Sequence, residues 1–143
     1  MYKAAVRWMI RRNVRALRSG DTGPVLAGYA DAAVLRFPGV SSWAGEHKGK
    51  AAIQSFLSRF VAVGLVVEVR EILVNGPPWR TSVCVVFTDT AADPEGNAVY
   101  ENRGVLFGRA AWGKITYQED FLDTQRVEAF DRYLESRPVP ASG

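Results

Sequence analysis

Residues that could carry acid/base chemistry lie in two strand-like segments in the second half of the chain. In residues 115–122, side chains two apart share a face of the predicted strand, and one face carries Thr116, Gln118, Asp120 and Leu122. In residues 99–107, Glu101 and Arg103 point the same way for the same reason. Parity leaves two interpretations open: a polar stripe exposed to solvent, or polar groups that face a buried site.

The elements that must position these residues follow from the spacing of apolar side chains. Helical spacing predicts helices over residues 4–18, from Asp21 onward for a short stretch, over residues 52–61, and after Asp123, which is a good N-cap. Valine-rich or alternating runs predict strands over residues 33–37, 65–74, 79–90, 99–111 and 115–121, with a loop at residues 41–48.

The order of these elements indicates the fold class. Helices cluster in the first half and antiparallel-looking strands in the second, which is typical of an α+β fold whose helices pack on one face of a curved sheet. No linker or repeat divides the chain, so we expect one domain over residues 1–136. Residues 137–143 hold two prolines and no apolar periodicity, which predicts a flexible tail.

Composition narrows the function classes. The 143 residues carry 18 basic and 15 acidic side chains, a net charge of +3, which permits an anionic partner without requiring one. The first helix carries a stripe of arginines at positions 7, 11, 15 and 18. Because no recognition motif or stacking aromatics accompany it, we interpret the stripe as a solvated helix face and do not expect nucleic-acid binding.

The single cysteine and single histidine give no zinc-type ligand set, and we expect no metal and no cofactor. Cys84 lies in an apolar run and is predicted to be a buried strand cysteine, whereas His47 lies in a predicted loop and is expected to face solvent. No apolar run approaches the roughly 20 residues of a membrane helix, and the N-terminus lacks a signal-peptide pattern. These observations favour the cytoplasm.

Several short motifs resemble those of one protein family. The motifs lie at residues 29–34, 37–39, 45 and 49–53, and in the second half at 100–103, 113–116 and 120–124. In order and spacing they resemble SnoaL-like proteins of the nuclear transport factor two-like superfamily, over residues 4–134. The resemblance implies a cone in which helices close a strongly bent sheet over an apolar pocket, and a homodimer formed through the outer sheet face. It does not fix the reaction, because the superfamily includes isomerases, cyclases, hydrolases and binding proteins.

The resemblance also implies a site. In related pockets the position of Asp120 faces inward, and those of Glu101 and Arg103 look toward the same cavity. An arginine can bridge two carboxylates through its forked donors, and the less well paired carboxylate could then exchange a proton. Such a trio is similar to the limonene epoxide hydrolase type of site, although here the carboxylate precedes the arginine on their strand. The alternative is a structural ion-pair network at the pocket floor.

Other members of the superfamily fit less well or in part. The ketosteroid isomerase type is not favoured, because Phe37 and Val105 stand where it has working carboxylates. A SnoaL-type cyclase needs an inward acid/base carboxylate late in the chain, and Asp120 matches that position, with His47 as a candidate helper.

We therefore expect a pocket protein, and the residues expected to line its pocket are Tyr29, Phe37, Trp43, Phe56, Phe60, Val105, Gln118 and Leu122. The expected function is acid/base catalysis of a cyclase, epoxide hydrolase or isomerase type on a small apolar metabolite. The alternative is a non-catalytic binding or dimeric assembly module of the same fold.

Overall fold

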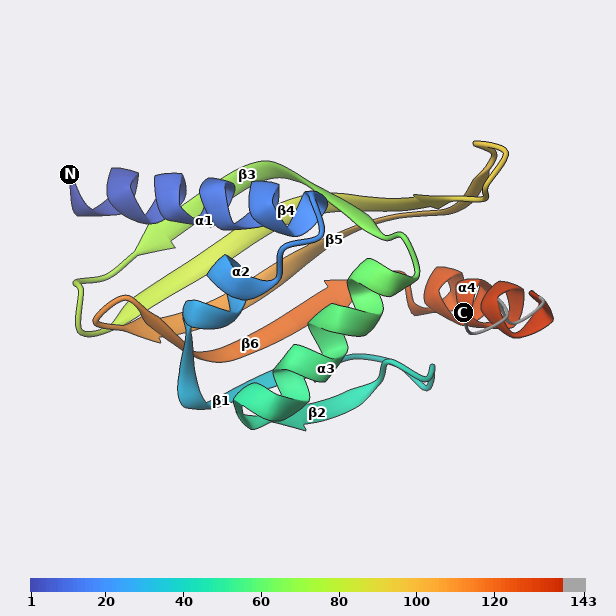
Figure 1. Ribbon diagram of the computed structural model, residues 1–143. Helices are drawn as coiled ribbons and strands as arrows, with labels where there is room; N and C mark the ends of the chain where they lie inside the picture. Colours follow the sequence, from blue (N-terminus) through green and yellow to red (C-terminus); the bar gives the residue numbers. More distant parts are fainter. Residues whose placement is uncertain (138–143) are drawn as a thin grey trace.

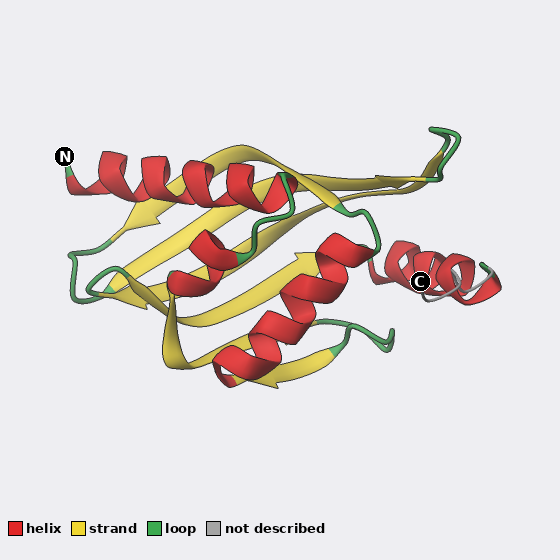
Figure 2. Ribbon diagram, viewed as in Figure 1, coloured by secondary structure: helices red, strands yellow, loops and turns green. Residues whose placement is uncertain are grey.

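The computed structural model describes residues 1–137 and has an α+β architecture (Figures 1 and 2). Its elements, in chain order, are α1 (Tyr2–Arg18), α2 (Gly23–Ala27), β1 (Tyr29–Phe37), β2 (Gly45–Lys48), α3 (Gly49–Ala62), β3 (Val66–Asn75), β4 (Thr81–Ala92), β5 (Ala98–Ala111), β6 (Lys114–Leu122) and α4 (Thr124–Ser136). The predicted fold class is confirmed. Of the predicted tail, residues 138–143 lie outside the described residues.

One mixed sheet contains all six strands in the order β2-β1-β6-β5-β4-β3. Only β1 and β6 run parallel, and the other neighbouring pairs are antiparallel. Helices α1, α2 and α3 lie over one face of this sheet, and α4 lies beyond one end of it (Figure 1). The covered face is called the inner face below, and the opposite face the outer face.

Two apolar clusters hold the helices on the inner face. Val6 of α1 packs on valines and isoleucine of β3 and β4, which is what its apolar stripe predicts. The other cluster joins β1 to α3 and α4 through residues such as Ile53 and Phe130. None of the helices in the described part of the chain is long and apolar enough to cross a membrane.

The observed elements differ from the sequence prediction in the expected loop at residues 41–48, part of which forms the edge strand β2. Residues 45–48 pair with β1, and apart from the half-buried His47 they are exposed, so this segment gives no apolar alternation to detect. Cys84 was predicted to be buried, but it is half-buried. It lies on the outer face, because Val83 and Val85 take the inner positions of β4.

The last helix begins as predicted. The Asp123 side chain accepts hydrogen bonds from the backbone N–H groups of Gln125 and Arg126. These bonds satisfy donors that the first turn of a helix leaves free.

Candidate functional site

A cavity of about 200 Å³ lies between the helices and the inner face of the sheet. Its walls are mostly aliphatic and aromatic and come from α1, α2, α3 and every strand except β2. Of the residues expected to line a pocket, those that line this cavity are Tyr29, Phe37, Phe56, Phe60, Gln118 and Leu122. Such a volume and lining suit a small, largely apolar molecule.

Asp120 of β6 lies in the wall of this cavity and is 9% exposed. Its Oδ1 accepts a hydrogen bond of 3.0 Å from Nε2 of Gln118. Its Oδ2 accepts no hydrogen bond from the described part of the protein. One carboxylate oxygen is therefore held in place, and the other is available to a molecule in the cavity.

A short relay fixes the orientation of the Gln118 amide. The Tyr29 hydroxyl donates a hydrogen bond of 2.5 Å to Oε1 of Gln118. That bond turns the amide Nε2 toward Asp120, because an amide that accepts at one end has its donors at the other. Burial, and then the charge of Asp120, raise the pKa of Tyr29 far above its usual range, so this hydroxyl keeps its proton.

The surroundings of Asp120 favour its protonated form more than water does. Its pKa is raised to about 6, chiefly because burial desolvates the carboxylate; the hydrogen bond from Gln118 opposes the rise, and the nearby charge of Glu119 adds to it. A carboxyl group with a pKa near the working pH can both accept and return a proton.

A second carboxylate, Asp89 of β4, lines the same cavity and was missed in the sequence analysis. It is 5% exposed, and the only hydrogen bond to its side chain from another described residue is a long one of 3.4 Å, from the Tyr100 hydroxyl to Oδ2. Its Oδ1 is buried without a partner. Desolvation by burial raises the pKa of Asp89 to about 6, and Asp120 adds to the rise while the Tyr100 bond opposes it.

The alternation along β4 could have revealed Asp89. Val83, Val85 and Phe87 share a parity with it and form an apolar face, so a strand buried on that face must carry Asp89 inward.

The strand register separates the two carboxylates by one row of side chains. Asp120 lies opposite Leu106 of β5, and Asp89 lies opposite Asn102. Between these rows, Phe87, Gly104 and Leu122 face one another across the three strands. A Cβ atom on Gly104 would come within 3.0 Å of the Phe87 ring and 2.9 Å of the Leu122 Cβ, so glycine lets both side chains close the floor of the cavity.

The expected trio of Glu101, Arg103 and Asp120 does not form. Residues directly opposite in an antiparallel pair share a face, and Asp120 lies opposite Leu106, which places even-numbered residues of β5 inward. Glu101 and Arg103 are therefore exposed on the outer face, while Asn102 between them is buried. Val105 has the same outward parity and does not line the cavity. The predicted inner face of β5 was wrong by one residue, and a shift of one residue along a strand moves every side chain to the opposite face.

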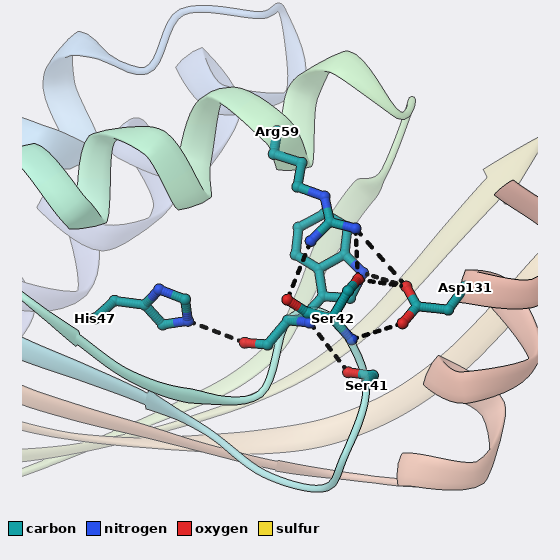
Figure 3. A network of polar contacts seen from close by, with 6 residues as sticks. Ser41, Ser42, His47, Arg59 and Asp131 are labelled. Carbon is teal, nitrogen blue, oxygen red and sulfur yellow. Dashed lines mark hydrogen bonds and ion pairs between the residues drawn. The ribbon is translucent and has the colours of Figure 1, made fainter. Parts of the chain in front are cut away.

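Trp43 lies apart from the main cavity but next to Asp89. It lines a smaller cavity of about 20 Å³ that shares Phe37, Phe56, Phe60 and Asp89 with the main one. Its indole Nε1 donates a hydrogen bond of 3.1 Å to Asp131 of α4 (Figure 3). Asp131 also accepts hydrogen bonds of 2.6 Å and 2.8 Å from the backbone N–H and hydroxyl of Ser42.

Arg59 of α3 completes this cluster around the loop. Its guanidinium lies 3.9 Å from the centre of the Trp43 ring and 3.8 Å from Asp131 (Figure 3). His47 was expected to face solvent, but it is half-buried, with Nε2 2.9 Å from the carbonyl oxygen of Trp43 and its ring against Phe56. It does not line either cavity, and its contacts hold the loop that carries Trp43.

Among the described residues that line the main cavity there is no lysine, arginine or histidine. Residues 1–137 also bring no three His, Cys, Asp or Glu side chains close enough to hold a metal ion. The carboxylates of the cavity therefore have no cationic side chain beside them in its wall.

The class of protein follows from this arrangement. Helices that close one face of a bent mixed sheet over an apolar cavity define the nuclear transport factor two-like fold. The sequence profile of the SnoaL-like domain matches residues 10–118, and the chain belongs to the SnoaL-like family.

Solved structures support the fold. The chain is similar to Bal32a from a soil-derived mobile gene cassette, at 21% identity and a TM-score of 0.76 over 89% of this chain and 96% of that one. It is also similar to TerC, which was co-crystallised with polyporic acid, at 25% identity and a TM-score of 0.72 over 92% and 98%. A third is an NTF2-like protein of Burkholderia xenovorans, at 22% identity and a TM-score of 0.65 over 88% and 94%. A search of curated proteins finds no match to this chain by sequence.

Proposed function

We propose that the protein is an acid/base enzyme that acts on a small, largely apolar molecule, with Asp120 as the group that accepts and returns a proton. The observation that carries the proposal is one carboxylate oxygen, Oδ2 of Asp120, which lies in the wall of an apolar cavity and accepts no hydrogen bond from residues 1–137. The other oxygen is held by the Tyr29–Gln118 relay. The similar protein TerC was crystallised with a small molecule, which agrees with a ligand in this pocket.

The pKa of Asp120 determines the direction of the chemistry. With a pKa of about 6, Asp120 is mostly ionised at neutral pH and can remove a proton from carbon or from water. Once protonated in an apolar pocket, it can return the proton to a developing oxyanion or carbanion. Cyclisation, isomerisation and hydrolysis through proton transfer all fit this behaviour.

The role of Asp120 as a base can be tested with a model reaction that does not require the natural substrate. In the Kemp elimination of 5-nitrobenzisoxazole, a base removes the proton on the ring carbon, that electron pair forms the nitrile, and the N–O bond breaks to release a coloured phenolate. We expect the protein to accelerate this reaction, with a rate that rises with pH through about 6 as Asp120 ionises. Asp120→Asn is expected to lower the rate by on the order of 100-fold.

The matched control is Glu101→Gln, because Glu101 is an exposed carboxylate on the outer face of β5. That variant is expected to keep the rate. Equal rates for Asp120→Asn and the unchanged protein would refute the assignment of the base.

We also propose that two copies associate through the outer sheet face. This face carries Leu73 and Phe121, which are 54% and 53% exposed, and large apolar side chains exposed on the same face favour a protein contact. Sedimentation is expected to give a dimer, and Phe121→Glu to give a monomer. A monomer at all concentrations in the unchanged protein would contradict this.

A further inference from the structure

Asp89 lies where the two cavities meet and is not used by the proton transfer proposed for Asp120. Its side chain lines both the main cavity and the smaller one beside Trp43. A buried carboxylate normally accepts several hydrogen bonds, because desolvation without compensation is costly. Asp89 accepts one, at 3.4 Å.

The neighbouring groups have no further donor to offer it. The Tyr100 hydroxyl has one proton and directs it to Oδ2 of Asp89. The Asn102 amide has two, and they are directed to the Tyr100 hydroxyl at 3.0 Å and to the backbone oxygen of Asp123 at 2.9 Å. Oδ1 of Asp89 is buried without a partner among the described residues, so the carboxylate can still accept a hydrogen bond from a molecule in the cavity that its side chain lines.

We propose that Asp89 orients the ligand by accepting, at its carboxylate, a hydrogen bond from an O–H or N–H group carried by an otherwise apolar molecule that reaches from Asp120. The inference rests on the proposed function and specifies its substrate class: ring systems with a hydroxyl or amino group, in preference to hydrocarbons, ethers or carboxylates. Anionic molecules are disfavoured because two carboxylates and no cationic side chain line the cavity among the described residues.

A matched pair of probes isolates the donor. The molecules 2-naphthol and 2-methoxynaphthalene have the same rings, but methylation removes the O–H. Isothermal titration calorimetry at pH 7 is expected to show 2-naphthol binding about tenfold more tightly, since a hydrogen bond to a charged group contributes roughly that factor. A third probe, 2-naphthylmethylamine, shows whether an ammonium group serves as well as a hydroxyl.

Asp89→Leu is expected to remove the preference by weakening 2-naphthol and leaving 2-methoxynaphthalene bound as before. Asp89→Asn keeps the volume and serves if the leucine variant does not fold; the neutral amide is expected to reduce the preference at least about threefold. Asp120→Asn is the matched control. It is expected to keep the preference for 2-naphthol, because the proposed hydrogen bond is accepted by Asp89.

The outcomes separate the two proposals. Equal binding of both naphthalenes to the unchanged protein, or a preference that Asp89→Asn leaves undiminished, overturns the role of Asp89 and leaves the pocket function standing. A preference that is lost in Asp120→Asn assigns the contact to Asp120 instead. If neither naphthalene binds, the pocket function fails, and the inference about Asp89 fails with it.

Discussion

Asp120 lies in the main cavity, and Asp131 lies in the cluster that it forms with Ser42, Trp43 and Arg59, called the loop cluster below. Both are largely buried carboxylates, but their partners differ. The Asp131 side chain is 14% exposed, accepts three hydrogen bonds from Ser42 and Trp43, and lies 3.8 Å from Arg59 (Figure 3). Asp120 is 9% exposed and accepts one, from Gln118. The same chemical group is thus satisfied at one end of the molecule and left partly unsatisfied at the other.

This difference separates stability from reactivity. Around Asp131, donors from the loop and α3 replace the lost water, so the carboxylate fastens the loop between two helices. Around Asp120, burial is only partly compensated, so the pKa rises to about 6 and one oxygen stays available. A carboxylate that contributes little to the fold, or opposes it, is retained only where it has another use.

The largest effect on stability is expected at the satisfied carboxylate. Asp131→Ala removes three hydrogen bonds and leaves the Trp43 indole N–H and the Ser42 N–H without their acceptor. The free energy of unfolding is expected to fall by about 2–4 kcal/mol, less than for a fully buried pair because Arg59 is partly exposed. Urea denaturation measures the change.

Glu135→Ala, at an exposed position of the same helix, is the control and is expected to change the free energy of unfolding by no more than about 0.5 kcal/mol. A loss below about 1 kcal/mol in Asp131→Ala would mean that the cluster does not fasten the loop.

At Asp120, the partly unsatisfied carboxylate, substitution is expected to change the free energy of unfolding with the opposite sign. Because the pKa of Asp120 rises from 3.8 to about 6 on folding, the folded state holds its proton more tightly than the unfolded state. The stability that the folded state gains from this tighter proton binding is fully present below about pH 4 and is lost as the pH rises through 6. At pH 7 the ionised group therefore lowers the free energy of unfolding, by at most about 3 kcal/mol.

Asp120→Asn removes this titration, so the variant is expected to be about 1–3 kcal/mol more stable than the unchanged protein at pH 7 and equal to it near pH 4. Thermal or urea unfolding across that range measures the difference. A variant that is destabilised at pH 7 would place Asp120 with Asp131, as a structural group.

Alternation and helical spacing were enough to predict the fold class, because apolar side chains mark the elements. They left both faces of β6 open, and the resemblance to SnoaL-like proteins was needed to expect Asp120 on the inner face. The Thr116–Leu122 face had the right parity for Asp120 and Gln118. The resemblance had placed Glu101 and Arg103 of β5 inward, and this assignment was wrong. The inner positions of β5 include Gly104 and Gly108, which have no side chain, while Val105 and Phe107 face outward, so the apolar pattern of β5 gave no signal against it.

The relay and the loop cluster could not be predicted for a different reason. Tyr29 and Gln118 are 89 residues apart, as are Ser42 and Asp131. Such pairs depend on the register of β1 against β6 and on where α4 packs, and neither leaves a local pattern in the sequence.

The smallest effect, and the sharpest test of the comparison, is expected from the relay. Tyr29→Phe removes the hydroxyl that fixes the Gln118 amide, so the bond from Nε2 to Asp120 is no longer enforced. Since that bond lowers the pKa of Asp120, the variant is expected to raise the pKa of Asp120. The midpoint of the pH dependence of the Kemp elimination rate, or a carbon-13 NMR titration of the Asp120 carboxyl, measures the shift.

Tyr117→Phe is the matched control, because Tyr117 lies on the outer face of β6 and its hydroxyl donates a hydrogen bond to Glu119 instead. If both variants leave the midpoint in place, Gln118 is held by packing alone and the relay has no part in setting the pKa of Asp120.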